Sequence, residues 1–440
     1  MSVVSALTLG LFAASTNAFP ASKQAPLFPQ DHTQNYNFGL RHGAPDGCKV
    51  TSASYLVRHG AIYANDDEYE EYIKPVLWKL EKHRGGFTGS MEFLNDWHSP
   101  ILEDHLEDIT PSGKEDAKKV GQHLLQLYPD LVPTTKRILA DKKPRTYDTA
   151  AAMMQAFPKP EEIEIVRITQ DVNGSMDSLI PHKACPKFNK KPGKKQMETF
   201  LDLYGKKAAR RLAKDTAFEL KPEDILGLQS ICGYQSAIEG KRSPLCGLFT
   251  DEEWMSYEYA WDLRYAYMVG PLNPLSPYLG FPWLESQLEL LDDIRSESAV
   301  RKGWPKDQNF FLSFTHREVP PFVATALGIF NSSSSEIEEF PTDRINWVRA
   351  WKMSDLIPFL GHVGMEKITC GGDGSAGAME GNFIRFVANT APRPIPQCQS
   401  GPGASCPFDE FKYIIEQGAK KYSDFHGVCG PSPKSAEEEL

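Results

Sequence analysis

The chain has 440 residues and a formal net charge of -10 at pH 7, with 41% hydrophobic and 24% charged residues. This composition is typical of a globular protein with a large core, and it excludes a mostly disordered chain. Nucleic acids and anionic membranes bind basic surfaces, so the negative charge argues against both as partners. Beyond the N-terminal region, no stretch approaches the roughly 18 consecutive apolar residues of a membrane span. We therefore expect neither a nucleic-acid partner nor a membrane span.

The N-terminus has the pattern of a secretion signal. Residues 3–14 form a short apolar run, and the small residues Thr16 and Ala18 that follow suit cleavage before Phe19. We interpret residues 1–18 as a signal peptide, although no Lys or Arg precedes the apolar run. The alternative is a frayed N-terminus without a targeting role. Residues 19–47 are rich in Pro, Gln, Asn and Gly and are expected to form an irregular arm.

The expected elements alternate between strands and helices at first, and strand signal returns late in the chain. In chain order they are a strand at 53–57, a helix at 69–81, a helix capped by Thr110 with Pro111 at its first position, a strand at 137–140, a helix at 147–156, and a strand at 310–314. The region between about 160 and 305 is mostly helical and irregular. This order predicts an α/β domain that is split by an inserted helical domain.

The domain boundaries follow from these elements. We expect a discontinuous α/β domain made of residues 48–159 and 305–430, and a mostly helical insertion at 160–304. Residues 431–440, which end in three glutamates and a leucine, are expected to form a solvated acidic tail.

The cysteines and two glycosylation motifs agree with a secretory route. The eight cysteines are an even number, and none forms a C-x-x-C pair or a Cys/His cluster with zinc spacing. Disulfides therefore fit better than a metal, and the sequence order alone leaves their pairing open. Asn173 and Asn331 begin N-x-S triplets that are candidate glycosylation sites, although such triplets also arise by chance.

Candidate catalytic residues follow the first predicted strand. Arg58-His59-Gly60 comes directly after it, and reactive groups of open α/β sheets lie at the carboxyl ends of strands. An imidazole nitrogen can attack phosphorus, and a guanidinium can hold two phosphoryl oxygens. The alternative is a structural histidine in a turn.

A second group of candidates follows the late strand at 310–314. His316 can donate to a phosphoryl oxygen, and a protonated Glu318 can give its proton to a leaving alkoxide. The alternative for Glu318 is the first turn of a helix, where a carboxylate stabilises the dipole. Arg145 lies between a strand and a helix, where a phosphate also meets helix N-terminal amides, but a single Arg is usually a surface charge.

Taken together, these motifs resemble the histidine acid phosphatases, in the branch with fungal acid phosphatases and phytases. The resemblance rests on Arg58-His59-Gly60, on Thr110-Pro111-x-Gly113, on Arg145 with Asp148-Thr149-Ala150, and on Thr315-His316, and it covers roughly residues 45–430. It implies a phosphoglycerate-mutase-like central sheet flanked by helices.

The resemblance also assigns roles to the candidate residues. It implies that His59 is phosphorylated, that Arg58, Arg145 and His316 bind phosphate, and that Glu318 is the proton donor. It implies no metal and no organic cofactor. It also implies four disulfides, namely Cys48–Cys370, Cys185–Cys429, Cys232–Cys246 and Cys398–Cys406.

Two departures from the family pattern bear on the site. The usual first motif has a second arginine two residues after the glycine, where this chain has Ile62. His316-Arg317-Glu318 stands where most fungal relatives have His followed directly by Asp, and it is more similar to the His-x-Glu of multiple inositol polyphosphate phosphatases. Arg317 is therefore a candidate replacement for the missing cation.

The function implied is that of a secreted, extracellular acid phosphatase that hydrolyses small phosphate monoesters. Acidic residues at 66–71 would repel a polyanion such as phytate if they line the pocket mouth, but they also fit a solvated helix start. The alternatives are a phytase or inositol polyphosphate phosphatase, and, from another class, a secreted binding protein that kept the fold but lost activity. A phosphoglycerate-mutase-like transferase is disfavoured by the expected signal and disulfides.

Overall fold

The structure is a computed structural model that describes residues 43–169, 179–292, 303–331, 339–371, 379–389 and 391–430. The expected signal peptide, most of the arm, Asn173 and the acidic tail lie outside these residues. Within the described ranges, no helix combines the length and the apolar character that crossing a membrane requires.

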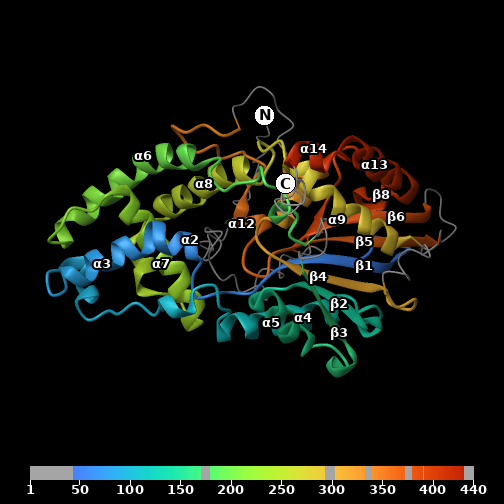
Figure 1. Cartoon of the computed structure of the whole chain (residues 1–440), viewed down its shortest axis with the longest axis horizontal. Helices are drawn as coiled ribbons and strands as arrows, with labels where there is room; N and C mark the ends of the chain where they lie inside the picture. Colours follow the sequence, from blue (N-terminus) through green and yellow to red (C-terminus); the bar gives the residue numbers. More distant parts are fainter. Residues whose placement is uncertain are drawn as a thin grey trace, which may run out of the picture.

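A mixed β-sheet forms the centre of the molecule (Figure 1). Its strands are β1 (Cys48–Arg58), β2 (Arg137–Asp141), β3 (Glu164–Ile168), β4 (Phe310–Thr315), β5 (His362–Gly371), β6 (Glu380–Ala388), β7 (Ala391–Arg393) and β8 (Cys406–Pro407). They lie in the order β3-β2-β4-β1-β5-β6-β7, and β8 pairs with β6. The strands from β3 to β1 are parallel, whereas β5, β6, β7 and β8 pair in antiparallel fashion. The strand β4, from late in the chain, therefore lies between two early strands.

Helices cover both faces of the sheet, and a separate group of helices forms a lobe beside it (Figure 1). One face carries α4 (Pro111–Leu127) and α5 (Pro144–Met154), and the other carries α9 (Ser276–Leu291), α11 (Val319–Ala326) and α13 (Phe408–Lys421). The lobe contains α2 (Asp66–Glu68), the π-helical turn η2 (Tyr69–Ile73), α3 (Lys74–Lys82), α6 (Lys194–Leu212), α7 (Pro222–Glu239) and α8 (Asp251–Met268). The short helices α12 (Met353–Leu356) and α14 (Phe425–Cys429) complete the fold.

The α/β class and the flanking helices agree with the sequence-based prediction, and the expected division of the chain differs in detail. Strand β3 pairs with β2, so the sheet continues beyond residue 159. Helix α9 packs on α11 and α13 beside the sheet, although it lies within the range expected for the insertion. Conversely, α3 packs on α7 in the lobe although it precedes residue 159. The chain thus crosses between sheet and lobe more often than the periodicity indicates.

The central strands are apolar because both of their faces are buried. Tyr55, Val57, Phe310 and Leu312 belong to the core shared with α4 and α5, whereas Leu56 belongs to the core on the opposite side. Alternate residues of a strand point to opposite faces, so a strand covered on both sides needs a continuous apolar run. This requirement explains why β1 and β4 could be recognised from the sequence.

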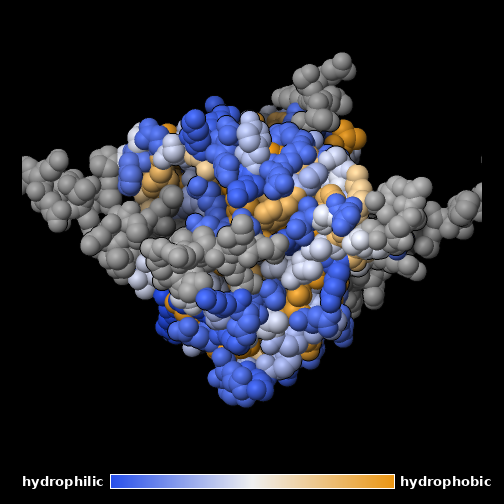
Figure 2. All heavy atoms as spheres, turned by 90° about the vertical axis from the view of Figure 1, so that its right-hand side faces the viewer, coloured by the Kyte–Doolittle hydropathy of each residue, from blue (hydrophilic) through white to orange (hydrophobic). Residues whose placement is uncertain are grey.

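Of the four disulfides, Cys48–Cys370 and Cys185–Cys429 link distant parts of the chain, whereas Cys232–Cys246 and Cys398–Cys406 close short loops. These are the pairs that the family resemblance implies. Figure 2, viewed from the right-hand side of Figure 1, shows a mostly hydrophilic face on which hydrophobic side chains occur in small separate groups. Asn331, a candidate glycosylation site, is exposed.

Candidate active site

The two histidines lie side by side at one edge of the sheet because of the register between β1 and β4. Arg58 pairs with Thr315 at the carboxyl ends of these parallel strands, and the backbone N–H of His59 donates to the Thr315 carbonyl at 3.0 Å. His59 and His316 therefore follow their strands at the same end of the sheet, next to each other. Their ring centroids are 5.5 Å apart, and the planes are inclined by 65°. Residues 257 positions apart in the sequence thus form one site.

The His59 ring is held in one tautomer. Its Nδ1 lies 2.9 Å from the Gly60 carbonyl oxygen. A carbonyl can only accept a hydrogen bond, so Nδ1 carries the proton and Nε2 carries the lone pair. Burial, and then the charges of Arg145 and Arg58, hold the pKa of His59 well below its usual value. The imidazole is therefore neutral and can act as a nucleophile.

The loop after His59 is fixed by two helices on the same side of the sheet. Thr149 of α5 accepts a hydrogen bond from the Gly60 N–H at 2.9 Å. The Thr110 hydroxyl caps α4 by accepting from the Gly113 N–H at 2.9 Å, as the sequence predicts. A side chain at Gly113 would overlap the backbone of Ala61, so only glycine allows α4 to approach this closely.

Two guanidinium groups flank the histidines. Arg58 is buried, its Nη1 donates to the Ile357 carbonyl at 2.6 Å, and its guanidinium lies 4.3 Å from the centre of the Phe359 ring. Burial, with help from the charge of Arg317, lowers the pKa of Arg58 to about 10, so it stays cationic in acid. Arg145, in the first turn of α5, pairs with Glu107 at 2.6 Å.

His316 is oriented by a carboxylate that the sequence reasoning missed. Its Nε2 donates to Oδ2 of Asp141 at 2.8 Å, and Asp141 is fully buried at the end of β2. Among the described residues, the buried Nδ1 of His316 has no hydrogen-bond partner. Burial lowers the pKa of His316, and the bond to Asp141 opposes this effect. An anion placed near Nδ1 would favour the protonated ring, which would then donate to it.

Glu318 lies buried at the start of α11, in a cationic environment. Burial raises the pKa of this carboxyl, but the charges of His182, Arg317, Lys190 and His316 outweigh burial and leave the pKa far below its usual value. The substrate-free site therefore holds Glu318 as a carboxylate. A proton donor at this position needs extra negative charge nearby, and a bound phosphate group supplies it.

Arg317 and Ile62, the two departures from the family pattern, occupy different surroundings. Ile62 is 1% exposed, belongs to the hydrophobic core, and forms an isolated β-bridge with Ile109. Arg317 is buried, pairs with Glu68, and donates to Oδ1 of Asn65 at 3.2 Å. Its Nε lies 3.8 Å from a Glu318 oxygen. Arg317 is therefore a cation next to the predicted proton donor.

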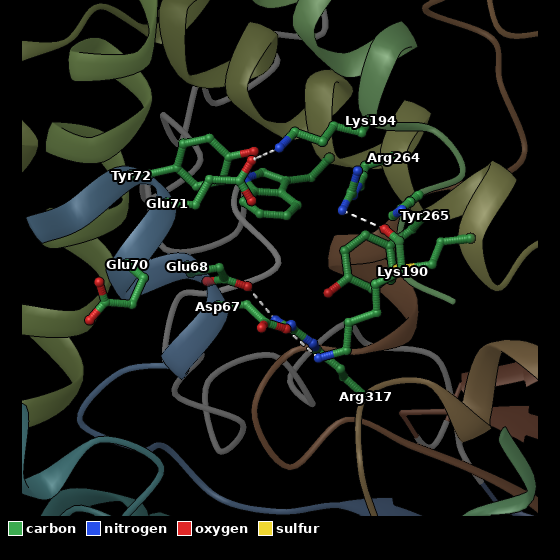
Figure 3. A pocket seen from close by; sticks show the side chains of 13 residues that line it. Asp67, Glu68, Glu70, Glu71, Tyr72, Lys190, Lys194, Arg264, Tyr265 and Arg317 are labelled. Carbon is green, nitrogen blue, oxygen red and sulfur yellow. Dashed lines mark hydrogen bonds and ion pairs between the residues drawn. The ribbon is translucent and has the colours of Figure 1, made fainter. Parts of the chain in front are cut away.

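A pocket of about 430 Å³ opens beside these residues, and Figure 3 shows its lining side chains. It is lined by Asp67, Glu68, Glu70, Glu71, Tyr72, Lys190, Lys191, Lys194, Trp261, Arg264, Tyr265, Met268 and Arg317. Most of the acidic residues at 66–71 therefore line the pocket, but lysine and arginine side chains pair with them. Lys190 binds Asp67, Lys194 binds Glu71, and Arg317 binds Glu68. With five cationic and four acidic side chains, the lining does not repel anions as the acidic run alone suggests.

Several site residues carry little sequence signal. Asp141 directly follows the strand predicted at 137–140, so the argument that singles out His59 could also have found it. Glu68, Glu107 and His182 reach the site from separate loops and helices, so only the fold brings them there. Within the described ranges, no group of three or more His, Cys, Asp or Glu side chains is arranged to hold a metal ion.

Comparison with known proteins places the chain in a family. The family model for the histidine phosphatase superfamily (branch 2) matches residues 49–389. A phytase of Candida albicans is 27% identical over 416 residues, covering 91% of this chain and 85% of the relative. An acid phosphatase of Komagataella pastoris is 25% identical over 404 residues, covering 89% of this chain and 82% of the relative.

Solved structures show the same fold. The crystal structure of the phytase from D. castellii superposes with a TM-score of 0.80 at 24% identity, covering 97% of this chain and 93% of that one. The multiple inositol polyphosphate phosphatase of Bifidobacterium longum superposes with a TM-score of 0.64 at 11% identity, covering 90% and 97%. The chain belongs to branch 2 of the histidine phosphatase superfamily. Within it, the chain is an enzyme of the acid phosphatase and phytase type.

Proposed function

We propose that this enzyme hydrolyses phosphate monoesters through a phosphohistidine formed on His59. The arrangement of His59 carries this proposal. The ring is neutral, Nδ1 is held by Gly60, and Nε2 is left with its lone pair beside His316 and two arginines. A neutral imidazole surrounded by cations is suited to attack an anionic phosphoryl group.

The reaction proceeds in two steps. Nε2 of His59 forms a bond to phosphorus while the bond to the ester oxygen breaks, and Arg58, Arg145 and His316 neutralise the phosphoryl oxygens. Glu318 gives its proton to the departing alkoxide, which leaves as an alcohol. Water then attacks the phosphohistidine and gives a proton to Glu318, so that inorganic phosphate and free His59 are formed.

This scheme requires an acid medium. Glu318 is a carboxylate in the substrate-free site, so it must take up a proton when the negatively charged substrate binds. Low pH favours this uptake, because a carboxylate such as Glu318 is protonated only when the pH is near or below its pKa. We expect maximal activity below neutrality, and a maximum above neutrality would contradict the role of Glu318.

Small phosphate monoesters in general are the proposed substrates. Inositol polyphosphates are the second candidate, because Lys190, Lys191, Lys194 and Arg264 line the pocket beside the site. The carboxylates that pair with some of these lysines compete with a polyanion, whereas a substrate with one phosphate does not depend on them.

The test compares the wild type with His59→Ala on p-nitrophenyl phosphate and on phytate at acid pH. We expect His59→Ala to lose activity on both, and rapid quenching of the wild type to trap a base-stable, acid-labile phosphoenzyme that the variant lacks. His426→Ala, a change at an exposed histidine, is the control and should keep wild-type rates. Absence of turnover of either substrate by the wild type would favour a binding protein of the same fold.

We also infer that the protein is secreted. The four disulfides, which persist mainly in oxidising compartments, and the exposed sequon residue Asn331 support this inference. Expression in a fungal host should give a protein in the culture medium that begins near Phe19. Retention of the whole product inside the cells would contradict it.

A further inference from the structure

A carboxylate outside the family motifs holds Arg145 beside the loop that follows His59. Glu107 lies in the connection before α4, and its Oε2 is 2.6 Å from Nη1 of Arg145. The two side chains are 23% and 15% exposed, so water screens this ion pair less than a pair on the surface. The Thr149 hydroxyl donates to the Arg145 carbonyl at 2.6 Å and accepts from the Gly60 N–H at 2.9 Å. These contacts place the ion pair next to the site.

The backbone of Glu107 has a conformation that residues with a side chain rarely adopt. Its φ is 69°, in the left-handed region that glycine favours. The conformation is held in place because the Glu107 N–H donates to the Ala64 carbonyl at 2.8 Å, and because Ile109 forms a β-bridge with Ile62. Such a backbone costs free energy, so a glutamate at this position points to a role for its side chain.

The second carboxylate oxygen of Glu107 fixes the loop that follows His59. Oε1 accepts from Nδ2 of Asn65 at 2.7 Å and from the backbone N–H of Asp66 at 3.2 Å. Oδ1 of Asn65 in turn accepts from Nη2 of Arg317 at 3.2 Å. Glu107 therefore joins the loop, through one oxygen, to a guanidinium that it contacts with the other.

The ion pair leaves another donor of Arg145 without a partner. A guanidinium has five N–H donors in a planar fork, and Nε–H and Nη1 lie on different edges of this plane. In the part of the chain that the structure describes, the buried Nε of Arg145 has no hydrogen-bond partner. A buried donor without a partner is costly, and two oxygens of a phosphoryl group can bind the edge that carries Nε.

We propose that Glu107 is a positioning residue, which holds Arg145 through Nη1 so that the Nε edge faces the phosphoryl group. The inference rests on the proposed function, in which Arg145 binds phosphate. A guanidinium that is fixed before the substrate arrives loses little freedom on binding. Without the carboxylate, the phosphate itself has to order Arg145, so both the bound substrate and the transition state are less stable.

Glu107→Gln tests this role with little change of shape. The amide oxygen of the glutamine can still accept both hydrogen bonds from the loop, whereas its NH₂ group faces Nη1 of Arg145, donor to donor. We expect kcat/KM on p-nitrophenyl phosphate to fall about 10-fold, and the inhibition constant of inorganic phosphate to rise by a similar factor. Glu103→Gln, on the same connection, breaks an exposed pair with Lys74 and should leave both values unchanged.

The same substitution in an Arg145→Ala background separates positioning from a general structural role. If Glu107 acts through Arg145, Glu107→Gln should cause less than about a twofold further loss in that background. An equal loss in both backgrounds, wild-type kinetics in Glu107→Gln, or tighter inhibition by phosphate would each overturn the proposal. Glu107→Gly, which suits the left-handed backbone, repeats the cycle if the Gln variant does not fold. A wild type without activity, or wild-type kinetics in Arg145→Ala, would instead overturn the proposed function.

Discussion

The carboxylate of Asp141, the last residue of β2, accepts a hydrogen bond at 2.8 Å from Nε2 of His316, which directly follows the adjacent parallel strand β4. In the proposed mechanism, this bond leaves Nδ1 of His316 to face an incoming phosphoryl group, and the carboxylate stabilises the protonated ring. In that mechanism, Asp141 acts on the phosphate through His316.

Asp141→Asn should lower kcat/KM on p-nitrophenyl phosphate by about 10- to 100-fold. The loss of a charge-assisted hydrogen bond costs about 1.5–3 kcal/mol, and the neutral amide no longer stabilises protonated His316. Inhibition by inorganic phosphate should weaken in parallel. Asp148→Asn, which breaks a more exposed pair with Lys114, is the control. Wild-type kinetics in Asp141→Asn would contradict the role of this bond.

Ile62→Arg should destabilise the protein and should not raise activity. Ile62 is buried in the core and bridges to Ile109, so an arginine there would bury an unpaired charge at a cost of several kcal/mol. A fall in the thermal midpoint together with an unchanged or lower kcat is expected. Ile62→Val, which removes one methylene, should cost only about 1 kcal/mol. A folded Arg variant with higher kcat would show that position 62 can serve the phosphate site after all.

The wild type should lose stability as the pH rises from 5 to 8, and Glu258→Gln should reduce this loss. Burial, and then the charge of Asp262, raise the pKa of Glu258 to about 7, although Ser354 and Arg349 bind it. The folded chain thus holds a proton there that the unfolded chain releases at lower pH. This contribution to stability is present in acid and is lost as pH rises through about 7. We expect a difference of about 1 to 3 kcal/mol between variant and wild type across this range, read from unfolding midpoints. Parallel pH profiles would contradict it.

Lys191→Gln should raise KM for phytate about two- to fivefold and leave p-nitrophenyl phosphate kinetics unchanged. Lys191 lines the pocket. In the proposed function for inositol polyphosphates, its charge acts on phosphate groups other than the one transferred. Lys195→Gln, an exposed neighbour outside the pocket lining, is the matched control. Equal effects of both changes would indicate general electrostatics in place of a subsite.

The sequence predicted those features that depend on local pattern. Strands β1, β2 and β4 and the cap at Thr110 agree with the prediction, because apolar runs and capping hydroxyls act over a few residues. Strand β3 was missed because it is an edge strand whose side chains are partly buried or exposed, so its sequence lacks an apolar run. The acidic run was misjudged for another reason: its partners Lys190 and Lys194 lie more than a hundred residues away in sequence, and only the fold brings them together.

The position of β4 between β1 and β2 determines when the enzyme first becomes able to act. A chain still being synthesised has β1, β2 and the whole lobe before residues 310–315 emerge to join the two strands. Until then His59 has no neighbouring His316, and β1 and β2 are not joined in one sheet. In the proposed mechanism, hydrolysis therefore cannot begin before residues 310–316 have been made, and fragments that end before β4 should be inert.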